Sequence, residues 1–558
     1  MAKSKRKSKH KSKKQKQAQQ PKLTLKERLA QQRQAKQVRQ KLISAIALCL
    51  GVMLVIGLPL ALVIGAKAGL AIGAGLPAMI ISYLYPRQAM WFFLIYLPIS
   101  GTVTYSIGGG NALFQLAKDA FYIPALIGMV LACKKAKQPI LIPKQMMPTL
   151  GILLVLSLST LFISNGALQF DPRQPGHPFF QGLLGLKVLV GYIPLIFCAY
   201  HLIKTKVELL FFARLHLILA IGCCLLGLLQ YWMLLSGRCM GTDHLSGSDL
   251  FKASLDARCF IGGSLLYSPS QGVIRLPGTF VSPWHWAWFL IPNSALTFAV
   301  AFCDPKALWR IIGLVGMALV FINAVICGQR IALALVPVVV ITLMLLTGQI
   351  TNLKRFVPIA AGLVLVLGIA VTNNPELVQE RIENFQGRWA ASPANEFIED
   401  QFGWALKSKP GLLGKGVGRA TNSTRIFGRV KLVETFHPKL IYEIGYLGLL
   451  AFLAVCTHLM IICFQGYRSV KNKNLRNLGS SYWVFLMIIS YFPYWYPLDT
   501  DPVAVYYWFL AGVILKLPVI DKQEEARLKL EAENNPELRK KRSNKKKKKR
   551  KKSQQLVS

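Results

Sequence analysis

The chain has 558 residues, of which 53% are hydrophobic and 16% are charged, and its formal net charge is +43. Apolar runs of about twenty residues recur along most of it, which is the length that a helix needs to cross a hydrocarbon core. A soluble protein of this size would divide into domains with polar surfaces, so this pattern excludes a soluble globular enzyme. It indicates an all-α polytopic membrane protein, because backbone amides in lipid must find their partners within the same segment.

The two ends of the chain are strongly basic. Residues 1–41 contain 16 lysines and arginines against one acid, and residues 521–558 contain 15 against six acids. Such blocks are typical of solvated, disordered segments, and attraction to anionic lipid headgroups is the functional alternative. No fold that reads bases accompanies the charge, so no nucleic acid partner is expected. We expect a disordered cytoplasmic arm over 1–41, a transmembrane domain over 42–519 and a basic cytoplasmic tail over 520–558.

Hydropathy predicts about 14 transmembrane helices (about 12–14, since one or two segments could be re-entrant). The expected spans are about 42–65, 68–86, 88–106, 115–133, 146–164, 181–203, 207–235, 284–303, 309–327, 331–348, 355–372, 438–464, 481–497 and 503–519.

The loops between these spans differ in charge and in length. If the amino-terminal arm is cytoplasmic, every short basic loop, such as 204–206, falls on the same side, as the positive-inside rule requires. The long loops, at about 165–180, 236–283 and 373–437, then fall on the opposite side. Both termini are therefore expected in the cytoplasm.

The eleven cysteines are unevenly placed. Nine lie in apolar segments, where a free cysteine behaves as a small hydrophobic residue. Cys239 and Cys259 share a polar loop, and they could form a disulfide if that loop faces an oxidising compartment. The spacing leaves both the paired and the unpaired state open.

The sequence gives little indication of a metal site. No pair of cysteines or histidines has the spacing of a zinc site. Asp499 and Asp501 flank a threonine as in the DxD motif of metal-dependent glycosyltransferases, where oxygen ligands would collect Mg²⁺ or Mn²⁺. Two acids in a short turn bounded by prolines are more often solvated, so we expect no metal and no cofactor.

Ionisable residues inside predicted spans cost about 2.5–3.5 kcal/mol each at a helix centre, so they usually have a purpose. Those near the side where the long loops are expected are Lys118, Asp119, Lys187, Arg330 and Glu443. Lys118 and Asp119 are adjacent in sequence, point about 100° apart and are not expected to pair with each other. Lys187 could instead extend to the interface, and the same is expected of Arg214 and His216 at the other end of their span.

A polar, glycine-bearing loop over 411–435 ends close to a lone histidine, His437, where an apolar helix begins. Arg330 also opens a membrane segment, after a Gly-Gln-Arg turn. Arginines match phosphate oxygens with two parallel hydrogen bonds, and a histidine can take a proton from an attacking hydroxyl. Together they suit the displacement of a phosphate leaving group by an alcohol.

Three stretches carry a resemblance to a known family. They are RLPGTF at 275–280 followed by a span with Pro292-Asn293, GQRIALA at 328–334, and PGLLGKGVG at 410–418 leading to His437 and then to Glu443-x-Gly445-x-x-Gly448. In order and spacing they resemble the bacterial O-antigen ligase and O-antigen polymerase superfamily of GT-C-type membrane glycosyltransferases. The chain departs from the family pattern at Pro438 and at Gln329, where the family has small polar residues.

The resemblance implies an inverting sugar transfer from an undecaprenyl-diphosphate-linked donor to an acceptor hydroxyl on a lipid, a glycan or a protein. It implies a bacterial plasma membrane protein that needs neither metal nor cofactor. His437 and Arg330 would be the catalytic residues, with His437 as the base or as a group that positions the acceptor. The residues implied to bind substrate are Arg275, Arg381, Arg388, Lys187 and Glu443.

Other functions stay open at this point. Ligase and polymerase share the same motifs and differ in the acceptor, which the sequence does not identify. A secondary transporter would use the charges in the spans to line a pathway, but transporters often have two similar halves, and the sequence shows no such repeat. A structural membrane protein would explain the spans but not the charges gathered near one end.

Overall fold

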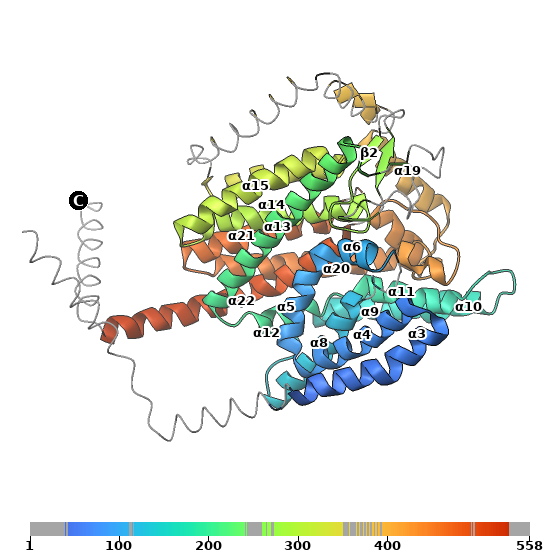
Figure 1. Ribbon diagram of the computed structural model, residues 1–558, viewed down its shortest axis with the longest axis horizontal. Helices are drawn as coiled ribbons and strands as arrows, with labels where there is room; N and C mark the ends of the chain where they lie inside the picture. Colours follow the sequence, from blue (N-terminus) through green and yellow to red (C-terminus); the bar gives the residue numbers. More distant parts are fainter. Residues whose placement is uncertain are drawn as a thin grey trace, which may run out of the picture. The chain divides into compact units, whose positions relative to one another are not determined.

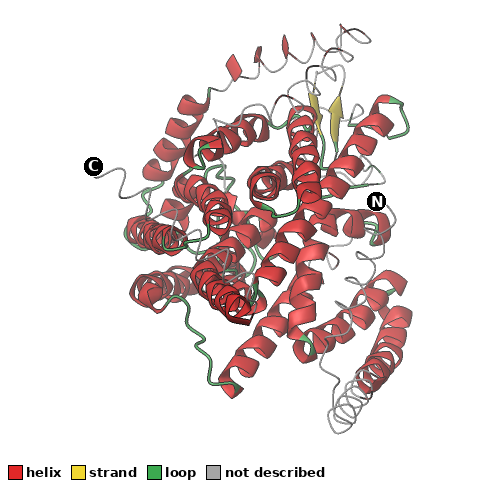
Figure 2. Ribbon diagram, turned by 90° about the vertical axis from the view of Figure 1, so that its left-hand side faces the viewer, coloured by secondary structure: helices red, strands yellow, loops and turns green. Residues whose placement is uncertain are grey.

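The computed structural model describes residues 40, 43–110, 114, 117–239, 241–242, 259, 261–263, 265–268, 273–349, scattered positions between 357 and 390, and residues 393–492, 494 and 497–534. These residues are helical almost throughout, with one pair of short strands (Figure 2). The chain divides into two compact units, Met1–Leu84 and Tyr85–Ser558.

The first unit is a helical hairpin. Its elements are η1 (Met53–Gly57), α3 (Leu58–Ile64) and α4 (Ala66–Leu84). Small residues face each other across it, since a Cβ on Gly73 would lie 2.8 Å from the Cα of Gly57, and one on Gly69 would overlap Ala61. Helices in lipid associate through such small residues, because these let the two backbones approach closely. The hairpin therefore rests on contacts that larger side chains would prevent.

The second unit contains the remaining elements. The first half comprises α5 (Pro86–Tyr96), η2 (Leu97–Ile99), α6 (Ser100–Thr102), η3 (Val103–Ile107), α8 (Ala117–Lys135), η4 (Lys144–Met146), α9 (Met147–Thr160), η5 (Leu161–Asn165), α10 (Gly166–Gln169), α11 (Pro178–Val190), α12 (Leu195–Leu202) and α13 (Lys206–Leu235). The second half comprises β1 (Leu266–Ser268), β2 (Val273–Arg275), α14 (Pro283–Cys303), α15 (Ala307–Ile326), α16 (Arg330–Leu346), α19 (Ala394–Lys407), η9 (Asn422–Ile426), α20 (Phe436–Arg468), α21 (Lys473–Tyr491), η10 (Pro497–Asp499) and α22 (Asp501–Asn534).

Nine helices in the described part of the chain are long and apolar enough to cross a membrane. The protein is therefore a helical membrane protein, but the predicted count of 14 spans is not confirmed. Helices are present at four other predicted spans, 68–86, 115–133, 331–348 and 481–497, but they are shorter in their apolar part or more polar. The predicted span at 355–372 falls almost wholly outside the described residues.

Helix α14 forms the centre of the second unit. It packs against α13, α15, α16, α21 and α22, and its most apolar window is completely buried; α13, α14 and α15 lie side by side in Figure 1. Its polar residues bond within the helix, since the Asn293 side chain donates to Phe289 O (2.7 Å) and Thr297 Oγ1 donates to Asn293 O (2.7 Å). These bonds satisfy the Asn293 amide N–H and the Thr297 hydroxyl, which are buried.

Two of the predicted long loops lie together at one end of the second unit, which we call the long-loop end. The Asn165 amide donates to Val417 O (3.0 Å) and its carbonyl accepts from Val417 N (2.8 Å). The backbone N–H of His177 donates to Phe427 O (2.6 Å). The third long loop contains a disulfide between Cys239 and Cys259, which settles the open question about this pair.

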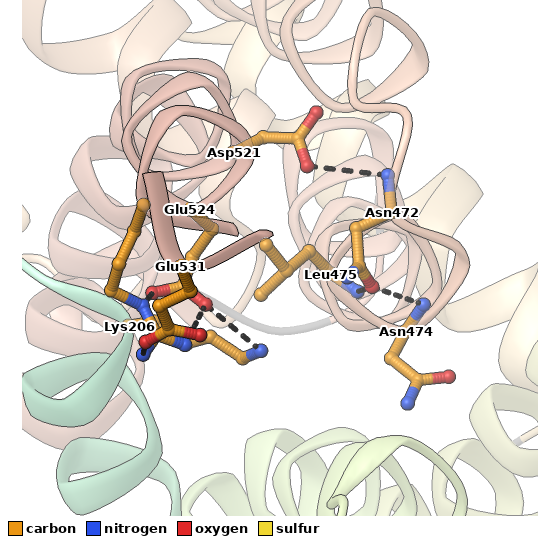
Figure 3. Close-up of polar contacts among 8 residues, drawn as sticks. Lys206, Asn472, Asn474, Leu475, Asp521, Glu524 and Glu531 are labelled. Carbon is orange, nitrogen blue, oxygen red and sulfur yellow. Dashed lines mark hydrogen bonds and ion pairs between the residues drawn. The ribbon is translucent and has the colours of Figure 1, made fainter. Parts of the chain in front are cut away.

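The short basic loops lie together at what we call the short-loop end. Arg87 donates to Leu202 O (2.9 Å) and to Glu208 (2.8 Å). The Asp521 carboxylate accepts from the backbone N–H groups of Lys471 (2.7 Å) and Asn472 (3.2 Å), as Figure 3 shows for Asn472. These contacts hold the start of α5 against the start of α13, and the turn before α21 against α22. The predicted segregation of all loops by length and charge stays a prediction.

Two expectations for this end are wrong. Arg214 does not extend to the interface, because its Nε and Nη2 donate to the buried carboxylate of Asp304 (2.8 and 2.9 Å). His216 is fully buried against Phe212, with ring centroids 4.2 Å apart.

The last helix, α22, continues well past the predicted end of its span at 519, and in Figure 1 it extends beyond its neighbours. The first part of the expected basic tail is therefore helical, and residues 535–558 lie outside the described part.

Candidate functional site

A backbone contact joins the RLPGTF stretch to the Gly-Gln-Arg turn. The N–H of Leu276, just after strand β2, donates to the carbonyl of Cys327 (3.1 Å). Gly328 has φ +67°, and a Cβ there would overlap the carbonyl oxygen of Ile274. Only glycine combines this conformation with so close an approach of two backbones. Two of the three sequence motifs therefore form one structural feature.

This contact brings the two predicted donor-binding arginines to one place. A Cβ on Gly328 would lie 3.5 Å from the Cα of Arg275, and Arg330 follows two residues after Gly328 as the first residue of α16. The Arg275 guanidinium also lies 5.9 Å from the centre of the Trp284 ring. Two arginines from segments 55 residues apart therefore lie on neighbouring stretches of backbone at a single turn.

Replacing Gly328 with alanine is expected to lower the free energy of unfolding by about 2 kcal/mol or more, from left-handed backbone strain and overlap with β2. Gly348→Ala is the matched control, because Gly348 has φ +68° but a Cβ there meets nothing within 4 Å. Thermal unfolding of both purified variants measures the difference. Equal losses would show that the contact between the turn and β2 contributes nothing beyond backbone strain.

A carboxylate that the sequence reasoning missed, Glu434, lies within electrostatic reach of Arg275. Burial raises the pKa of Glu434, and the positive charge of Arg275 opposes part of that rise. The backbone N–H of Glu434 donates to the side chain of Gln401 (2.9 Å), which fixes the chain just before α20. We call Arg275, Arg330 and Glu434 the arginine-turn group. The available sequence signal was an acid three residues before the lone histidine.

The raised pKa of Glu434 predicts a pH-dependent stability. The folded state keeps the proton of Glu434 at pH values where the unfolded chain has released it. The contribution of this group to the free energy of unfolding is therefore fully present below the unfolded pKa of about 4.3, and it is lost as the pH rises through the folded pKa. The neutral variant Glu434→Gln should therefore gain stability relative to the wild type across that window. Unfolding temperatures between pH 4 and pH 8, with exposed Glu396→Gln as control, test this; a constant difference would contradict it.

Helix α20 is broken at Gly445, which has φ +73° and ψ −174°. The glycine-bearing loop enters the break, where the N–H groups of Lys415 and Gly416 donate to the carbonyls of Tyr442 (2.8 Å) and Glu443 (3.2 Å). A Cβ on Gly414 would overlap the Glu443 carbonyl, and one on Gly445 would overlap the loop. The glycines of this third motif are therefore required where the loop backbone meets the helix backbone.

Glu443 holds the same loop with its side chain. The buried carboxylate accepts from the Ala420 N–H (2.6 Å) and from the Thr421 hydroxyl (3.0 Å), and the ammonium of Lys439 lies 3.9 Å away. Glu443 therefore bonds to residues of the chain itself and holds the loop against α20. Its predicted contact with substrate is not tested by this arrangement.

Glu443 belongs to a larger set of paired charges, the lysine–carboxylate cluster, in which Lys439 and Glu443 are buried and the other members are partly exposed. Its members are Lys118, Lys187, Lys439, Asp119, Glu443, Asp499 and Asp501. Lys439 pairs with Asp499, and Lys118 pairs with Asp501. The adjacent residues Lys118 and Asp119 face different partners, in line with the expected 100° between them. Segments far apart in sequence are therefore joined at this cluster by ion pairs.

Lys187 is placed by the same cluster. Its ammonium lies 2.9 Å from the carboxylate of Asp119 and 5.1 Å from the centre of the Tyr192 ring. The Tyr192 hydroxyl donates to Asp501 (2.9 Å). Lys187 thus does not simply extend to the interface, because it is held by an ion pair. Any anionic ligand would have to compete with Asp119 for it.

The turn that resembles a DxD motif is also part of this cluster. Asp499 and Asp501 each pair with a lysine, so the expectation of a solvated turn is wrong. A metal ion at these carboxylates would have to displace two ammonium groups. Among the described residues, no group of three or more histidines, cysteines and acids is placed to hold a metal.

His437 lies in the first turn of α20, between Glu434 and Lys439 in the chain. It is 9% exposed, and its side chain lies near the backbone of Ser490. The following proline fits this position, because the first turn of a helix leaves its N–H unpaired in any case. Of the other predicted contacts, Arg381 and Arg388 lie outside the described residues.

No family model matches the chain, and no curated protein matches it either. The resemblance to the O-antigen ligase and polymerase superfamily therefore rests on the three sequence motifs alone. In the structure two of them meet at the arginine turn, and the third closes the break in α20. The predicted residues fall into two groups, the arginine-turn group and the lysine–carboxylate cluster, with His437 between them in the chain.

Proposed function

We propose that the protein is a membrane glycosyltransferase. It moves a glycan from a lipid-diphosphate donor of the undecaprenyl type to an acceptor hydroxyl at the extracytoplasmic face. The observation that supports this proposal is the arginine turn, where the backbones of Arg275 and of the Gly328–Arg330 turn lie together at the start of α16. Guanidinium groups on these two segments would match the oxygens of a diphosphate.

In the proposed reaction, Arg275, Arg330 and His437 have different roles. The arginines hold the diphosphate and stabilise the negative charge that grows on it as the sugar–phosphate bond breaks. The acceptor oxygen attacks the anomeric carbon from the opposite side, which inverts that centre. His437 takes the proton from the attacking hydroxyl. The products are the glycosylated acceptor and the free lipid diphosphate.

The proposal includes an orientation. The short-loop end carries the basic loops, so the positive-inside rule assigns it to the cytoplasm, together with both termini. The arginine turn then faces the extracytoplasmic side of a bacterial plasma membrane. A donor anchored in the bilayer would enter from the side, and the acceptor is a lipid, a protein or, for a polymerase, a second lipid-linked glycan.

A reconstituted assay tests the proposal. The purified chain is supplied with a lipid-diphosphate-linked oligosaccharide and a choice of acceptors, with and without EDTA, and products are resolved by mass. Transfer to a different acceptor in EDTA would support a ligase, and a doubled glycan would support a polymerase. Transfer that EDTA abolishes would favour the metal-dependent alternative, and no donor turnover with any acceptor would reject the proposal.

A specific observation favours a secondary transporter as the second candidate. Helix α20 breaks at Gly445 next to the lysine–carboxylate cluster, and helicity is also interrupted between α11 and α12, over 191–194. Transporters place such broken helices at their binding sites. Uptake of solutes into liposomes that contain the protein tests this function. Uptake without donor turnover would replace the first candidate with the second.

A further inference from the structure

A groove opens at the short-loop end, between the start of α13 and the later part of α22. Its volume is about 510 Å³, within the range of about 300–1,000 Å³ that is usual for small-molecule sites. The lining has an apolar part, Val207, Leu210 and Ile520, and a polar part, Lys206, Glu524 and Arg527. Figure 3 shows Lys206 and Glu524 in contact with each other. The groove thus combines an apolar wall with a charged edge.

The charged edge of the groove contains two cations, Lys206 and Arg527, and one carboxylate, Glu524. Glu524 is shared by two cations, with Lys206 Nζ at 3.4 Å and Arg527 Nε at 3.1 Å. Arg527 also contacts Glu531 at 2.7 Å, but both side chains are about half exposed, and such surface pairs contribute little. Arg527 also donates from Nη2 to Glu524 (3.2 Å). A phosphate would therefore take the place of Glu531 at Arg527 Nη1 and of Glu524 at Lys206 Nζ, while Glu524 keeps its two hydrogen bonds from Arg527.

The apolar wall continues along the outside of α13. Val207, Phe211, Ile218 and Leu225 are each more than half exposed. Their spacing of four, seven and seven residues places them on one face of the helix. Since α13 is one of the candidate membrane spans, this stripe runs from the groove down into the hydrocarbon. A ligand with a phosphate and an acyl chain fits both parts, whereas free phosphate would leave the stripe unused.

We propose that this groove binds an anionic phospholipid. The phosphate lies between Lys206 and Arg527, and one acyl chain follows the stripe that begins at Val207. The site is separate from the arginine-turn group and does not depend on glycosyl transfer. It uses folded residues of α13 and α22 rather than the lysine blocks near the two termini.

Lipid binding to the purified full-length protein in detergent tests the proposal. Phosphatidylglycerol is expected to bind more tightly than phosphatidylcholine by native mass spectrometry. Removing both cations, with Lys206→Gln and Arg527→Gln, should weaken phosphatidylglycerol binding by about 25-fold, since each cation near an anionic headgroup contributes about fivefold. The control Lys522→Gln with Lys529→Gln removes the same charge from exposed positions on α22 and should change binding less than about threefold.

A third variant gives the opposite expectation. Glu524→Gln removes the carboxylate that competes for both cations, so it should strengthen phosphatidylglycerol binding. Thermal unfolding without lipid checks that all variants fold. Equal binding of the two lipids, or equal losses in the two double variants, would overturn the proposal. Full competition by glycerol phosphate would also overturn it, because that result would mean that the acyl chain contributes nothing.

Discussion

Replacing Arg330 with alanine is expected to lower glycan transfer by about a thousandfold or more, which is the effect of removing an arginine that stabilises charge on a phosphate leaving group. Arg330→Lys is expected to fail as well, because an ammonium cannot reproduce the two parallel hydrogen bonds of a guanidinium. Arg275→Ala should behave like Arg330→Ala, since both residues meet at Gly328. The reconstituted assay with a lipid-diphosphate-linked donor measures all three variants.

The control for Arg330 is an arginine of the same end with no assigned role. Arg425 is exposed, and its side chain donates to Asn422 three residues earlier (3.0 Å). Arg425→Lys should leave both transfer and unfolding temperature unchanged. If Arg330→Lys folds normally and transfers glycan at the wild-type rate, the guanidinium does not bind the leaving group. The arginine turn would then be only a structural contact, and a secondary transporter would become the favoured function.

The sequence predicts well those features that depend on neighbouring residues. Hydropathy locates the helices, because the apolar length of a segment is a local property. Glycine-rich stretches likewise mark places where two backbones touch, as Gly328 and Gly414 do. The span count is harder, because a helix such as α21 begins with a polar turn and packs among other helices, so its apolar window is short. Hydropathy cannot separate such helices from full spans.

Ion pairs between residues that lie far apart in the sequence could not be predicted in this way. Lys439 pairs with Asp499 and Lys118 with Asp501 over 60 and 383 residues of sequence. No local pattern specifies these pairs, because they depend on how α8 packs against α22 and α20 against η10. For the same reason the sequence identified Glu443 as an isolated charge and missed both Lys439 and Glu434. The two aspartates illustrate the limit, since their spacing resembles a metal motif but their neighbours are lysines.

Lys439→Met is expected to lower the free energy of unfolding by about 3–5 kcal/mol, which is the usual effect of leaving a buried charge without its partner. Lys439 is 3% exposed and serves two carboxylates, those of Asp499 and Glu443. Denaturant titration of the purified protein measures the loss. The control is Lys471→Met, whose partner Glu525 lies at the surface and whose own side chain is 78% exposed; it should cost less than about 1 kcal/mol.

A second substitution separates stability from function. Adding Asp499→Asn to Lys439→Met removes one of the two carboxylates that lost their cation, so part of the lost stability should return, and Glu443 keeps its hydrogen bonds from Ala420 and Thr421. If the double variant is no more stable than Lys439→Met, the pair is not the reason for the loss. If stability does return, the variant also discriminates between the two candidate functions. A glycosyltransferase that relies on the arginine-turn group should keep its activity, whereas a transporter that uses the lysine–carboxylate cluster should lose uptake in a protein that still folds.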